Sequence, residues 1–381
     1  MHFELESVHQ ARKEAGAAFG AHLNIDLTAA AHGAQWPQAA WARAAQAGLV
    51  AMLIPQAYGG QGGDPLGTAA ALEGLGYGCT DGGFCFALGA HLWGCAMPIA
   101  LFGTEEQKTS LLPGLCNGSK IGALAITEPD AGSDAFHLCA AATPAPDGYR
   151  LDGHKTFITN GPIADVTLVL ASEDTARGAH GLAGFLVARD AAGSRRVGPL
   201  AKMGLNTAQM GELILEDCFV PAARRLGHAR LGIAIFSHAM EWERGMILAP
   251  VVGAMQRQLE RCIAYAQQRR QFGRPIGHFQ LVASKLVDMH LRLEQARWAL
   301  YRFAWLKQQG RSAFREAAIA KLTISEAWVA SCQDALQIHG GYGYLSESGL
   351  EREWRDAPAA RIYSGTSEIQ RQVIAQWLGV G

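Results

Sequence analysis

The sequence changes its periodicity twice, and this change constrains the fold more than any other feature. Up to about residue 117 the pattern is helical, as in the Ala- and Leu-rich run AWARAAQAGLVAML at 40–53. From about residue 121 to 221, short β-type runs at 166–170, 184–188 and 212–219 alternate with turns, such as Pro-Asp-Gly at 146–148. After residue 222 the helical pattern returns. Helices, a small β region and helices again predict three domains.

Local signals refine the two helical regions. Thr104 stands ahead of two acidic residues, as an N-cap does, and the Gly-rich run PQAYGGQGGD at 55–64 predicts a break between helices. In the last third, apolar residues recur every three or four positions from Leu286 to Phe303, and Gly310 is placed to end that helix. Pro250 should kink a helix or mark a boundary. The periodicity predicts an antiparallel helical bundle.

Composition narrows the class of protein. The chain has 381 residues, 49% of them apolar, which is enough for a large core. With 33 basic against 34 acidic residues there is no net field to hold nucleic acid or an anionic membrane. The start MHFELESVHQ is unlike a secretion signal, and the apolar stretch at 48–54 is too short to span a bilayer. Eight scattered cysteines without a CxxC pair predict reduced, mostly buried thiols and no metal centre. We expect a cytoplasmic protein.

Four segments carry groups that suit a polar cofactor, although each alone is also typical of ordinary structure. AITEPDAGSDAF at 125–136 offers hydroxyls and turn amides, and HKTFITNGPIADV at 154–166 puts Phe157 and Thr159 on one side of a strand. RRQFGRPI places Arg269 and Phe272 three apart at a helix end, where a guanidinium can bind a diphosphate. QIHGGYGY supplies adjacent glycines. No GxGxxG or P-loop fingerprint appears, which disfavours a Rossmann domain.

Taken in order, these segments resemble the acyl-CoA dehydrogenase family across nearly the whole chain. The matching runs are PQAYGG, TEPDAGSD, KTFITNG, KMGLNTAQ, LEDCFVP, MEWERG, RRQFGRPI with Gln280, QIHGGYGY and RDAPAARIYSGTSE. The resemblance implies an α+β fold with an N-terminal α-helical domain at 1–118, a middle β-barrel or sandwich domain at 119–225, and a C-terminal four-helix bundle at 226–381. It also implies a homotetramer, a dimer of dimers, in which each subunit binds one FAD.

The same resemblance assigns cofactor residues. It implies that the flavin ring lies on the middle domain, and that a neighbouring subunit grips the ADP half, with the end of the bundle closing the site. The residues so implied are Leu124, Ile126, Thr127, Gly132, Ser133, Phe157, Thr159, Arg269, Phe272, Gln280, Gln337, Gly340, Gly341, Thr366 and Glu368. Two positions depart from common members: Phe157 stands where Trp is frequent, and Asn206 stands in KMGLNTAQ where Arg is frequent, so that its strand need not keep the usual contacts.

The catalytic base is the informative departure. Many members carry the catalytic Glu at the position of Ser364, and a serine hydroxyl alone cannot remove a C–H proton. In isovaleryl-CoA and long-chain acyl-CoA dehydrogenases the base comes from a bundle helix, which here corresponds to Glu243 in MEWERG. The resemblance implies that the backbone N–H of residue 364 holds the thioester carbonyl. The implied substrate pocket then contains Ser364, Arg244, Ser133 and Tyr363. An equally good interpretation of Arg244 is that it forms a structural ion pair.

The implied reaction is α,β-dehydrogenation of an acyl-CoA to a trans-2-enoyl-CoA, with electron-transfer flavoprotein as the expected acceptor. Three alternatives stay open: an acyl or aminoacyl group on a carrier protein, a flavin monooxygenase or oxidase, and a non-enzymatic flavin- or DNA-binding relative. Retention of Glu243 and near-neutral charge speak against the last two. Chain length and branching of the substrate are not fixed by the sequence. His91 either lines the acyl pocket or, as we expect, is a packed core histidine.

Overall fold

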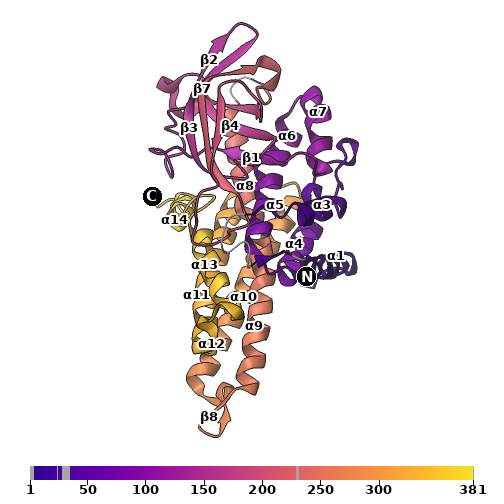
Figure 1. Ribbon diagram of the computed structural model, residues 1–381, viewed down its shortest axis with the longest axis vertical. Coiled ribbons are helices and arrows are strands. Elements are labelled where there is room, and N and C mark those ends of the chain that lie inside the picture. The colour runs from indigo at the N-terminus through magenta and orange to yellow at the C-terminus, as the bar shows by residue number, and fades with distance from the viewer. Residues whose placement is uncertain (1–3, 24, 28–34, 229–230, 381) are drawn as a thin grey trace.

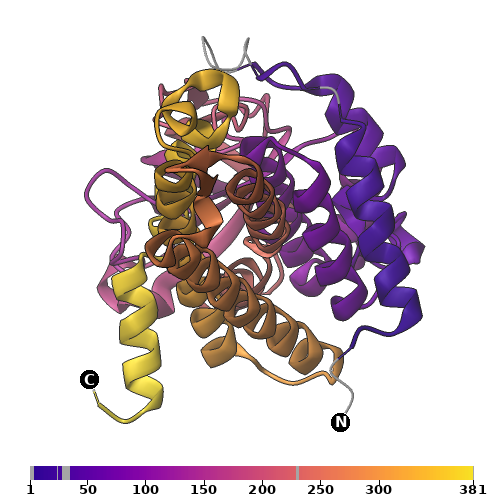
Figure 2. The same cartoon turned by 90° about the horizontal axis from the view of Figure 1, so that it is seen from below.

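The protein is described here from a computed structural model that places residues 4–23, 25–27, 35–228 and 231–380. The β region lies at one end of an elongated body and the long helices extend from it to the other end, while the N-terminal helices pack along the side (Figure 1). Viewed along the bundle, these N-terminal helices lie on one flank and the last helix on another (Figure 2). The three-part architecture and the α+β class are therefore as predicted.

The N-terminal helices are α1 (Ser7–Ala21), α3 (Gln38–Gln46), α4 (Pro65–Gly78), α5 (Gly82–His91), α6 (Met97–Phe102) and α7 (Glu105–Cys116). Thr104 caps α7 in a capping box with Gln107, which confirms the predicted helix start. The predicted helix at 40–53 is instead interrupted at Gly48, which takes a φ of 76° before the 3₁₀ turn η1 (Leu49–Ala51). A second 3₁₀ turn, η2 (Gln56–Tyr58), lies in the predicted Gly-rich break.

Helices α5 and α6 are joined without a break by a π-helical turn, η3 (Leu92–Ala96). The combined segment Gly82–Phe102 is long and apolar enough to cross a membrane by length and composition. The expectation that the longest apolar stretch lies near 48–54 and is too short to span a bilayer is therefore wrong. In the structure 83% of the most apolar window of Gly82–Phe102 is buried inside the protein. It therefore serves as a core helix, against which the sheet and the bundle pack.

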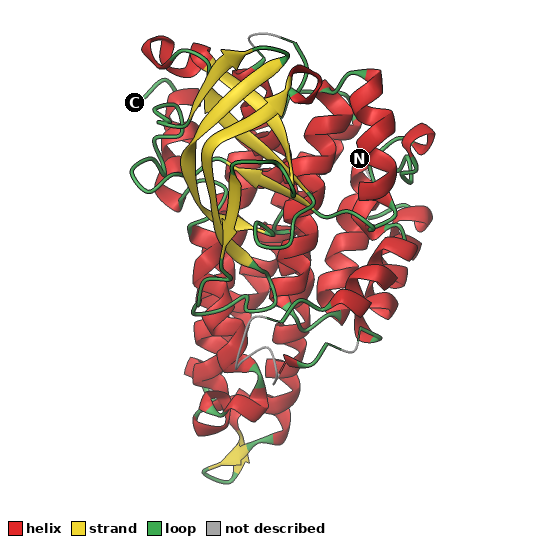
Figure 3. Cartoon of the chain, turned by 45° about the horizontal axis from the view of Figure 1, so that its top comes forward, coloured by secondary structure: helices red, strands yellow, loops and turns green. Residues whose placement is uncertain are grey.

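The middle region is one curled seven-stranded sheet (Figure 3). Its strands are β1 (Gly122–Ala125), β2 (Ala141–Ala145), β3 (Gly148–Thr159), β4 (Val166–Ser172), β5 (Leu182–Ala188), β6 (Ser194–Val197) and β7 (Met210–Pro221). The order is β1-β4-β2-β3-β7-β6, with β5 also paired to β4, and β1 runs parallel to β4. The three strands predicted from sequence are present as β4, β5 and β7. Asn206 lies in a turn before β7, so its assignment to a strand was wrong.

The two faces of β4 pack into different cores. Val166, Leu168 and Leu170 belong to the large cluster shared with the N-terminal helices and the bundle, whereas Val169 and Ala171 face a smaller cluster inside the curled sheet. Because successive side chains of a strand point to opposite faces, a strand buried on both faces reads as a continuous apolar run. Strand β4 is therefore the element that ties the sheet to the helices.

The C-terminal region contains α8 (Gly232–Met246), α9 (Ala249–Gln268), α10 (Gln280–Gln308), α11 (Phe314–His339), α12 (Gly341–Tyr344), α13 (Leu350–Asp356) and α14 (Ser367–Trp377). Pro250 marks the start of α9, where its missing N–H leaves no helical bond unmade. Helix α10 ends at Gln308, and Gly310 follows with a φ of 67°. A small hairpin, β8 (Arg270–Gln271) and β9 (Arg274–Pro275), forms the far tip of the bundle (Figure 1).

Candidate active site

Glu243 and Ser364 meet where α8 faces the turn before α14. They are 121 positions apart in sequence, yet the Ser364 hydroxyl donates a hydrogen bond of 2.6 Å to Oε1 of Glu243. Both residues are partly buried. The structure therefore brings together the two residues that the sequence analysis singled out for the base and for the position of the missing base.

The surroundings of Glu243 oppose its ionisation and partly compensate for it. Burial raises the pKa of Glu243 above its ordinary range, while the Ser364 hydrogen bond, Arg244 and Lys321 act to lower it. Burial in turn lowers the pKa of Arg244, and it lowers the pKa of Lys321 to about 7. A carboxyl group with a raised pKa is a stronger proton acceptor than an ordinary one, and among the described residues only one oxygen of Glu243 accepts a hydrogen bond.

The residues that precede Ser364 and Glu243 in sequence each belong to an aromatic pair. The ring of Tyr363, immediately before Ser364, packs on Phe86 of α5 with centroids 4.3 Å apart. Trp242, immediately before Glu243, stacks on Trp93 of the π-helical turn at 5.8 Å and an interplanar angle of 7°. The charge of Glu243 contributes to a raised pKa of the Tyr363 phenol, so this ring lies near the carboxylate, whereas the tryptophan pair packs on another face of α8. The sequence analysis placed Tyr363 here but missed the tryptophan pair, because nothing in the spacing links residues 93 and 242.

The TEPDAGSD segment forms a loop after β1 that a buried ion pair holds in place. Glu128 accepts hydrogen bonds from the amides of Cys139 and Ala140 and pairs with Lys155 at 2.6 Å. Gly132 and Ser133 lie exposed on this loop, and a Cβ at Gly132 would meet nothing within 4 Å. The remaining loop candidates are partly exposed at the end of β1: Leu124, Ile126 and Thr127.

Phe157 and Thr159 lie on the less buried side of β3, whereas Thr156 and Ile158 between and beside them are buried. The ladder to β7 shifts register between Lys155 and Ile158, and Phe157 takes a φ of 56° there. The Phe157 ring is 61% exposed. An aromatic ring held outward by a strained backbone is available to stack on a flat ligand.

A second group of candidates lies at the far tip of the bundle. Arg269 caps the end of α9 and Phe272, 94% exposed, lies in the hairpin turn. Arg269 also lines a cavity of about 400 Å³ together with Gly340 and Gly341. Gln337 and Gln280 are exposed on the neighbouring helices α11 and α10. Within one chain this group is at the opposite end of the bundle from the sheet (Figure 1), so the structure does not bring the two groups of cofactor candidates together.

Thr366 and Glu368 begin α14. The Thr366 hydroxyl accepts a hydrogen bond of 3.3 Å from the amide of Ile369, so Thr366 has a capping role of its own. Glu368 is exposed in the first turn of the helix, where its negative charge interacts favourably with the positive end of the helix dipole. His91 is fully buried and its Nδ1 accepts a hydrogen bond of 2.9 Å from the Gly122 amide. It is thus a packed core histidine, as expected.

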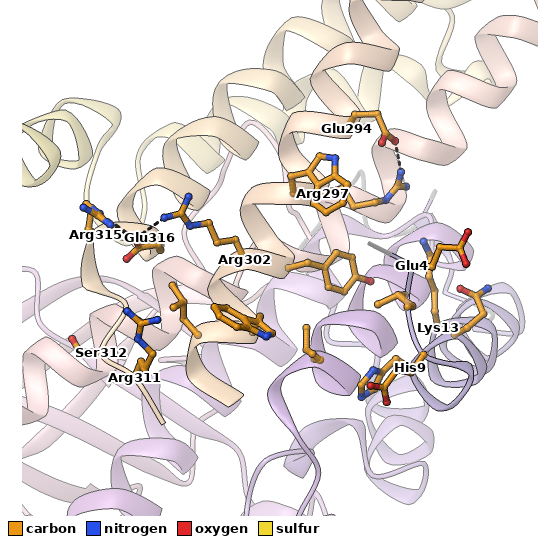
Figure 4. A pocket seen from close by; sticks show the side chains of 18 of the residues that line it. Glu4, His9, Lys13, Glu294, Arg297, Arg302, Arg311, Ser312, Arg315 and Glu316 are labelled. Atoms are coloured by element: carbon orange, nitrogen blue, oxygen red, sulfur yellow. Dashed lines mark hydrogen bonds and ion pairs between the residues drawn. The ribbon is translucent and has the colours of Figure 1, made fainter. Parts of the chain in front are cut away.

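A cavity of about 1490 Å³ lies elsewhere, between α1, the second half of α10 and the start of α11 (Figure 4). It is lined in part by Trp298, Trp305 and Arg311, and ion pairs such as Arg297 with Glu294 cross its wall. None of the candidate site residues is among the side chains that line it. Size alone therefore does not locate the chemistry in this protein.

Comparison with known proteins gives a family for this arrangement. Three family models match: "Acyl-CoA dehydrogenase, N-terminal domain" at 6–119, "Acyl-CoA dehydrogenase, middle domain" at 123–218 and "Acyl-CoA dehydrogenase, C-terminal domain" at 230–379. The chain is 46% identical over 89% of its length, and 89% of the relative, to an L-prolyl-[peptidyl-carrier protein] dehydrogenase of Pseudomonas fluorescens.

Two solved structures share the whole fold. The prolyl acyl carrier protein oxidase AnaB is 48% identical, with a TM-score of 0.96 over 99% of this chain and 100% of that one. PigA, solved with FAD and proline, is 38% identical, with a TM-score of 0.96 over 100% of both chains. Since the family models together match nearly all of the sequence, the chain belongs to the acyl-CoA dehydrogenase family.

Proposed function

We propose that this protein is an FAD-dependent enzyme that dehydrogenates an aminoacyl thioester, the L-prolyl group of a peptidyl carrier protein, between its α and β carbons. The observation that carries the chemistry is the partly buried Glu243, which accepts a hydrogen bond from Ser364 and has a raised pKa. The substrate class is supported by relatives that share 46% and 48% of the sequence along almost the whole chain.

In this mechanism Glu243 removes the α-proton of the thioester while the hydride leaves the β carbon with its electron pair. In this proposal the backbone N–H of Ser364 donates to the thioester carbonyl, on which negative charge develops as the proton leaves. Burial keeps the pKa of the Glu243 carboxyl above its ordinary range, as a general base requires. FAD, when bound, supplies the hydride acceptor.

The residues present fit an FAD site to which two subunits contribute. Phe157 points outward from β3 beside Thr159, which suits the flat ring system. At the bundle tip, Arg269 supplies a cation for a diphosphate, and Gly341 lacks a side chain although a Cβ there would meet nothing within 4 Å. Because the two groups lie at opposite ends of one chain, the tip of a neighbouring subunit would complete each site, as in a homotetramer.

The runner-up substrate is an acyl-CoA, which the family name supports. The electron acceptor is electron-transfer flavoprotein or dioxygen. The sequence analysis disfavoured an oxidase, but the relative described as an oxidase favours dioxygen. We place the protein in the cytoplasm, where carrier-bound and CoA-bound thioesters are made.

The decisive experiment is anaerobic. The yellow holoprotein is mixed with L-prolyl-loaded carrier protein, with the unloaded carrier, with free L-proline and with short, branched and long acyl-CoAs, and the flavin absorbance is followed. We expect rapid bleaching by the prolyl carrier alone. Bleaching by a CoA ester and not by the prolyl carrier would overturn the substrate proposal in favour of acyl-CoA dehydrogenation.

The same preparation identifies the acceptor and the assembly. Admitting air to the bleached protein should restore the yellow colour within seconds if dioxygen is the acceptor, whereas slow recovery points to electron-transfer flavoprotein. Light scattering of the holoprotein should give four chains, and a monomer that retains FAD would overturn the shared-site proposal.

A further inference from the structure

Three side chains hold the backbone carbonyls of the turn that carries Ser364. Arg244 Nε donates to the Ser364 carbonyl at 3.0 Å, and Lys321 Nζ donates to the Gly365 carbonyl at 2.7 Å. Gln370 Nε2 bonds both carbonyls, at 3.2 and 2.7 Å. We call Arg244, Lys321 and Gln370 the carbonyl clamp; its members come from α8, α11 and α14.

The clamp explains an unusual backbone. Ser364 takes a φ of 56° and Gly365 a φ of 86°, two successive residues in the left-handed region. A serine there is unfavourable by about 1 kcal/mol or more, so the surrounding contacts must impose it. A Cβ on Gly365 would lie 2.9 Å from Gln370 Nε2 and 3.3 Å from an Arg244 nitrogen, which is why glycine is required beside the clamp.

The consequence of this conformation is the direction of the Ser364 hydroxyl. It donates to Oε1 of Glu243 at 2.6 Å, a short, charge-assisted distance. Among the described residues, this is the hydrogen bond that the Glu243 carboxylate accepts, and it engages one oxygen. The other oxygen, Oε2, is left to receive a proton.

The charged and titratable groups that face Glu243 come from three elements. Arg244 follows it on α8, Lys321 approaches from α11 with a fully buried side chain, and the Tyr363 phenol lies on the turn. Both cations are also bound to carbonyls of the turn, so the segment that places Ser364 is held by the groups that stabilise the Glu243 charge.

We infer that Ser364 is a positioning residue for the base: its hydroxyl fixes the Glu243 carboxylate in one orientation and leaves Oε2 as the oxygen that takes the α-proton. This inference rests on the proposed function, in which Glu243 is the base. It separates two roles of one residue, because the backbone N–H of Ser364 serves the substrate carbonyl while its side chain serves the base. The carbonyl clamp maintains both.

The test compares Ser364→Ala and Ser364→Gly in the holoenzyme. Both remove the hydroxyl and keep the backbone N–H, and glycine in addition relieves the left-handed strain. In anaerobic stopped-flow reduction across pH 5.5 to 9, we expect the limiting rate of both variants at pH 7 to fall about tenfold. The substrate Kd should stay within about twofold, because the carbonyl contact is retained.

The pH profile provides the specific readout. The Ser364 hydrogen bond lowers the pKa of Glu243, so its removal raises that pKa, and less of the base is ionised at a given pH. The acid limb of the rate profile should therefore move up by about one pH unit in both variants. Infrared titration of the carboxyl stretch that Glu243→Gln abolishes should show the same shift without any substrate.

Ser367→Ala is the matched control. Its hydroxyl donates to Glu326 Oε1 at 2.7 Å, three positions further along the same segment and outside the proposed site. Its reduction rate and acid limb should equal those of the natural chain. If Ser364→Ala and Ser364→Gly leave rate, acid limb and infrared titration unchanged, the positioning role is wrong. A weaker Kd with an unmoved acid limb would also overturn it, and would assign Ser364 to the substrate carbonyl alone.

The two proposals fail in different ways. A normal rate of flavin reduction in Glu243→Gln would exclude Glu243 as the base and would overturn the proposed mechanism. An inactive Glu243→Gln together with normal Ser364 variants would leave the mechanism standing and exclude only the positioning role. If no prolyl carrier bleaches the flavin, the infrared titration still decides whether Ser364 sets the ionisation of Glu243.

Discussion

The two groups of candidate residues in this chain are built in opposite ways. Around Glu243 the chain provides its own partners: a serine hydroxyl, the basic side chains of Arg244 and Lys321, and the ring of Tyr363. At the bundle tip, Phe272 is 94% exposed and Arg269 lines a cavity, with the ring of Tyr342 near its guanidinium. The first group is complete in one chain, and the second is built to receive something else.

This difference teaches where each kind of function resides. Proton transfer needs a carboxylate with a perturbed pKa, and only a packed interior can perturb it strongly. Binding a long cofactor needs exposed aromatic and cationic groups whose partners arrive later. Substitutions around Glu243 should therefore change the rate of flavin reduction, whereas substitutions at the bundle tip should change the retention of FAD.

The largest expected effect is at the partly buried Glu243. Glu243→Gln keeps the shape and the hydrogen-bond acceptor for Ser364 but cannot take a proton. We expect flavin content to be unchanged and reduction by substrate to slow by about 10²–10⁴-fold, the contribution of a general base. Stopped-flow reduction with absorbance spectra measures both quantities, and a rate within threefold of the natural chain would contradict the assignment.

At the bundle tip the expected effect is on FAD. Arg269→Gln should weaken FAD binding by about tenfold, because a charge-assisted hydrogen bond to a diphosphate is lost. The limiting reduction rate of the fraction that retains FAD should stay normal. Dialysis against a flavin-free buffer followed by absorbance at the flavin band measures retention. Arg311→Gln, in the cavity of Figure 4, is the control of equal charge change; equal flavin loss in both variants would contradict the site at the tip.

A smaller effect is expected on the pH dependence of the free energy of unfolding, through Asp356. Asp356, at the end of α13, accepts a hydrogen bond from the Leu205 amide, and burial, assisted by the charge of Asp81, raises the pKa of Asp356 to about 7. In the unfolded chain that carboxyl ionises near pH 4, so stability is lost as pH rises from about 4 to 7. Asp356→Asn stays neutral and keeps the acceptor for Leu205.

We therefore expect Asp356→Asn to gain on the order of 1–3 kcal/mol relative to the natural chain between pH 5 and pH 8. Denaturant midpoints at the two pH values measure the difference. The exposed Asp217, paired with Arg150, is the control, and Asp217→Asn should show no such trend. Parallel behaviour of the natural chain and Asp356→Asn would show that the carboxyl is ionised in the folded protein at both pH values.

The smallest effect is expected from Phe272→Ala. With 94% of its side chain exposed, Phe272 contributes little to the fold of its own chain, and the free energy of unfolding of the flavin-free protein should change by less than about 0.5 kcal/mol. FAD retention should nevertheless decrease, since the ring is available for stacking. A large loss of stability together with unchanged flavin content would show that Phe272 serves the fold of its own chain and does not bind FAD.

The elements of the fold could be predicted because their signals are local. The capping box at Thr104, the period of apolar residues from Leu286 to Phe303 and the apolar run of β4 each depend on neighbours a few positions away. The missed break at Gly48 and the misplaced Asn206 are of the opposite kind. Gly48 takes a φ of 76°, and Asn206 lies in a turn between strands rather than in one.

The sequence by itself determined which residues could act: the order of motifs pointed to Glu243, and the serine at position 364 required a base from elsewhere. It could not connect them, because Glu243 and Ser364 are 121 positions apart and Lys321 lies 44 positions from Gly365. Only the packing of α8 and α11 against the final turn decided that two cations bind its carbonyls and that the hydroxyl of Ser364 meets the carboxylate. Burial and side-chain direction are properties of the assembled core, and they decide the ionisation of Glu243.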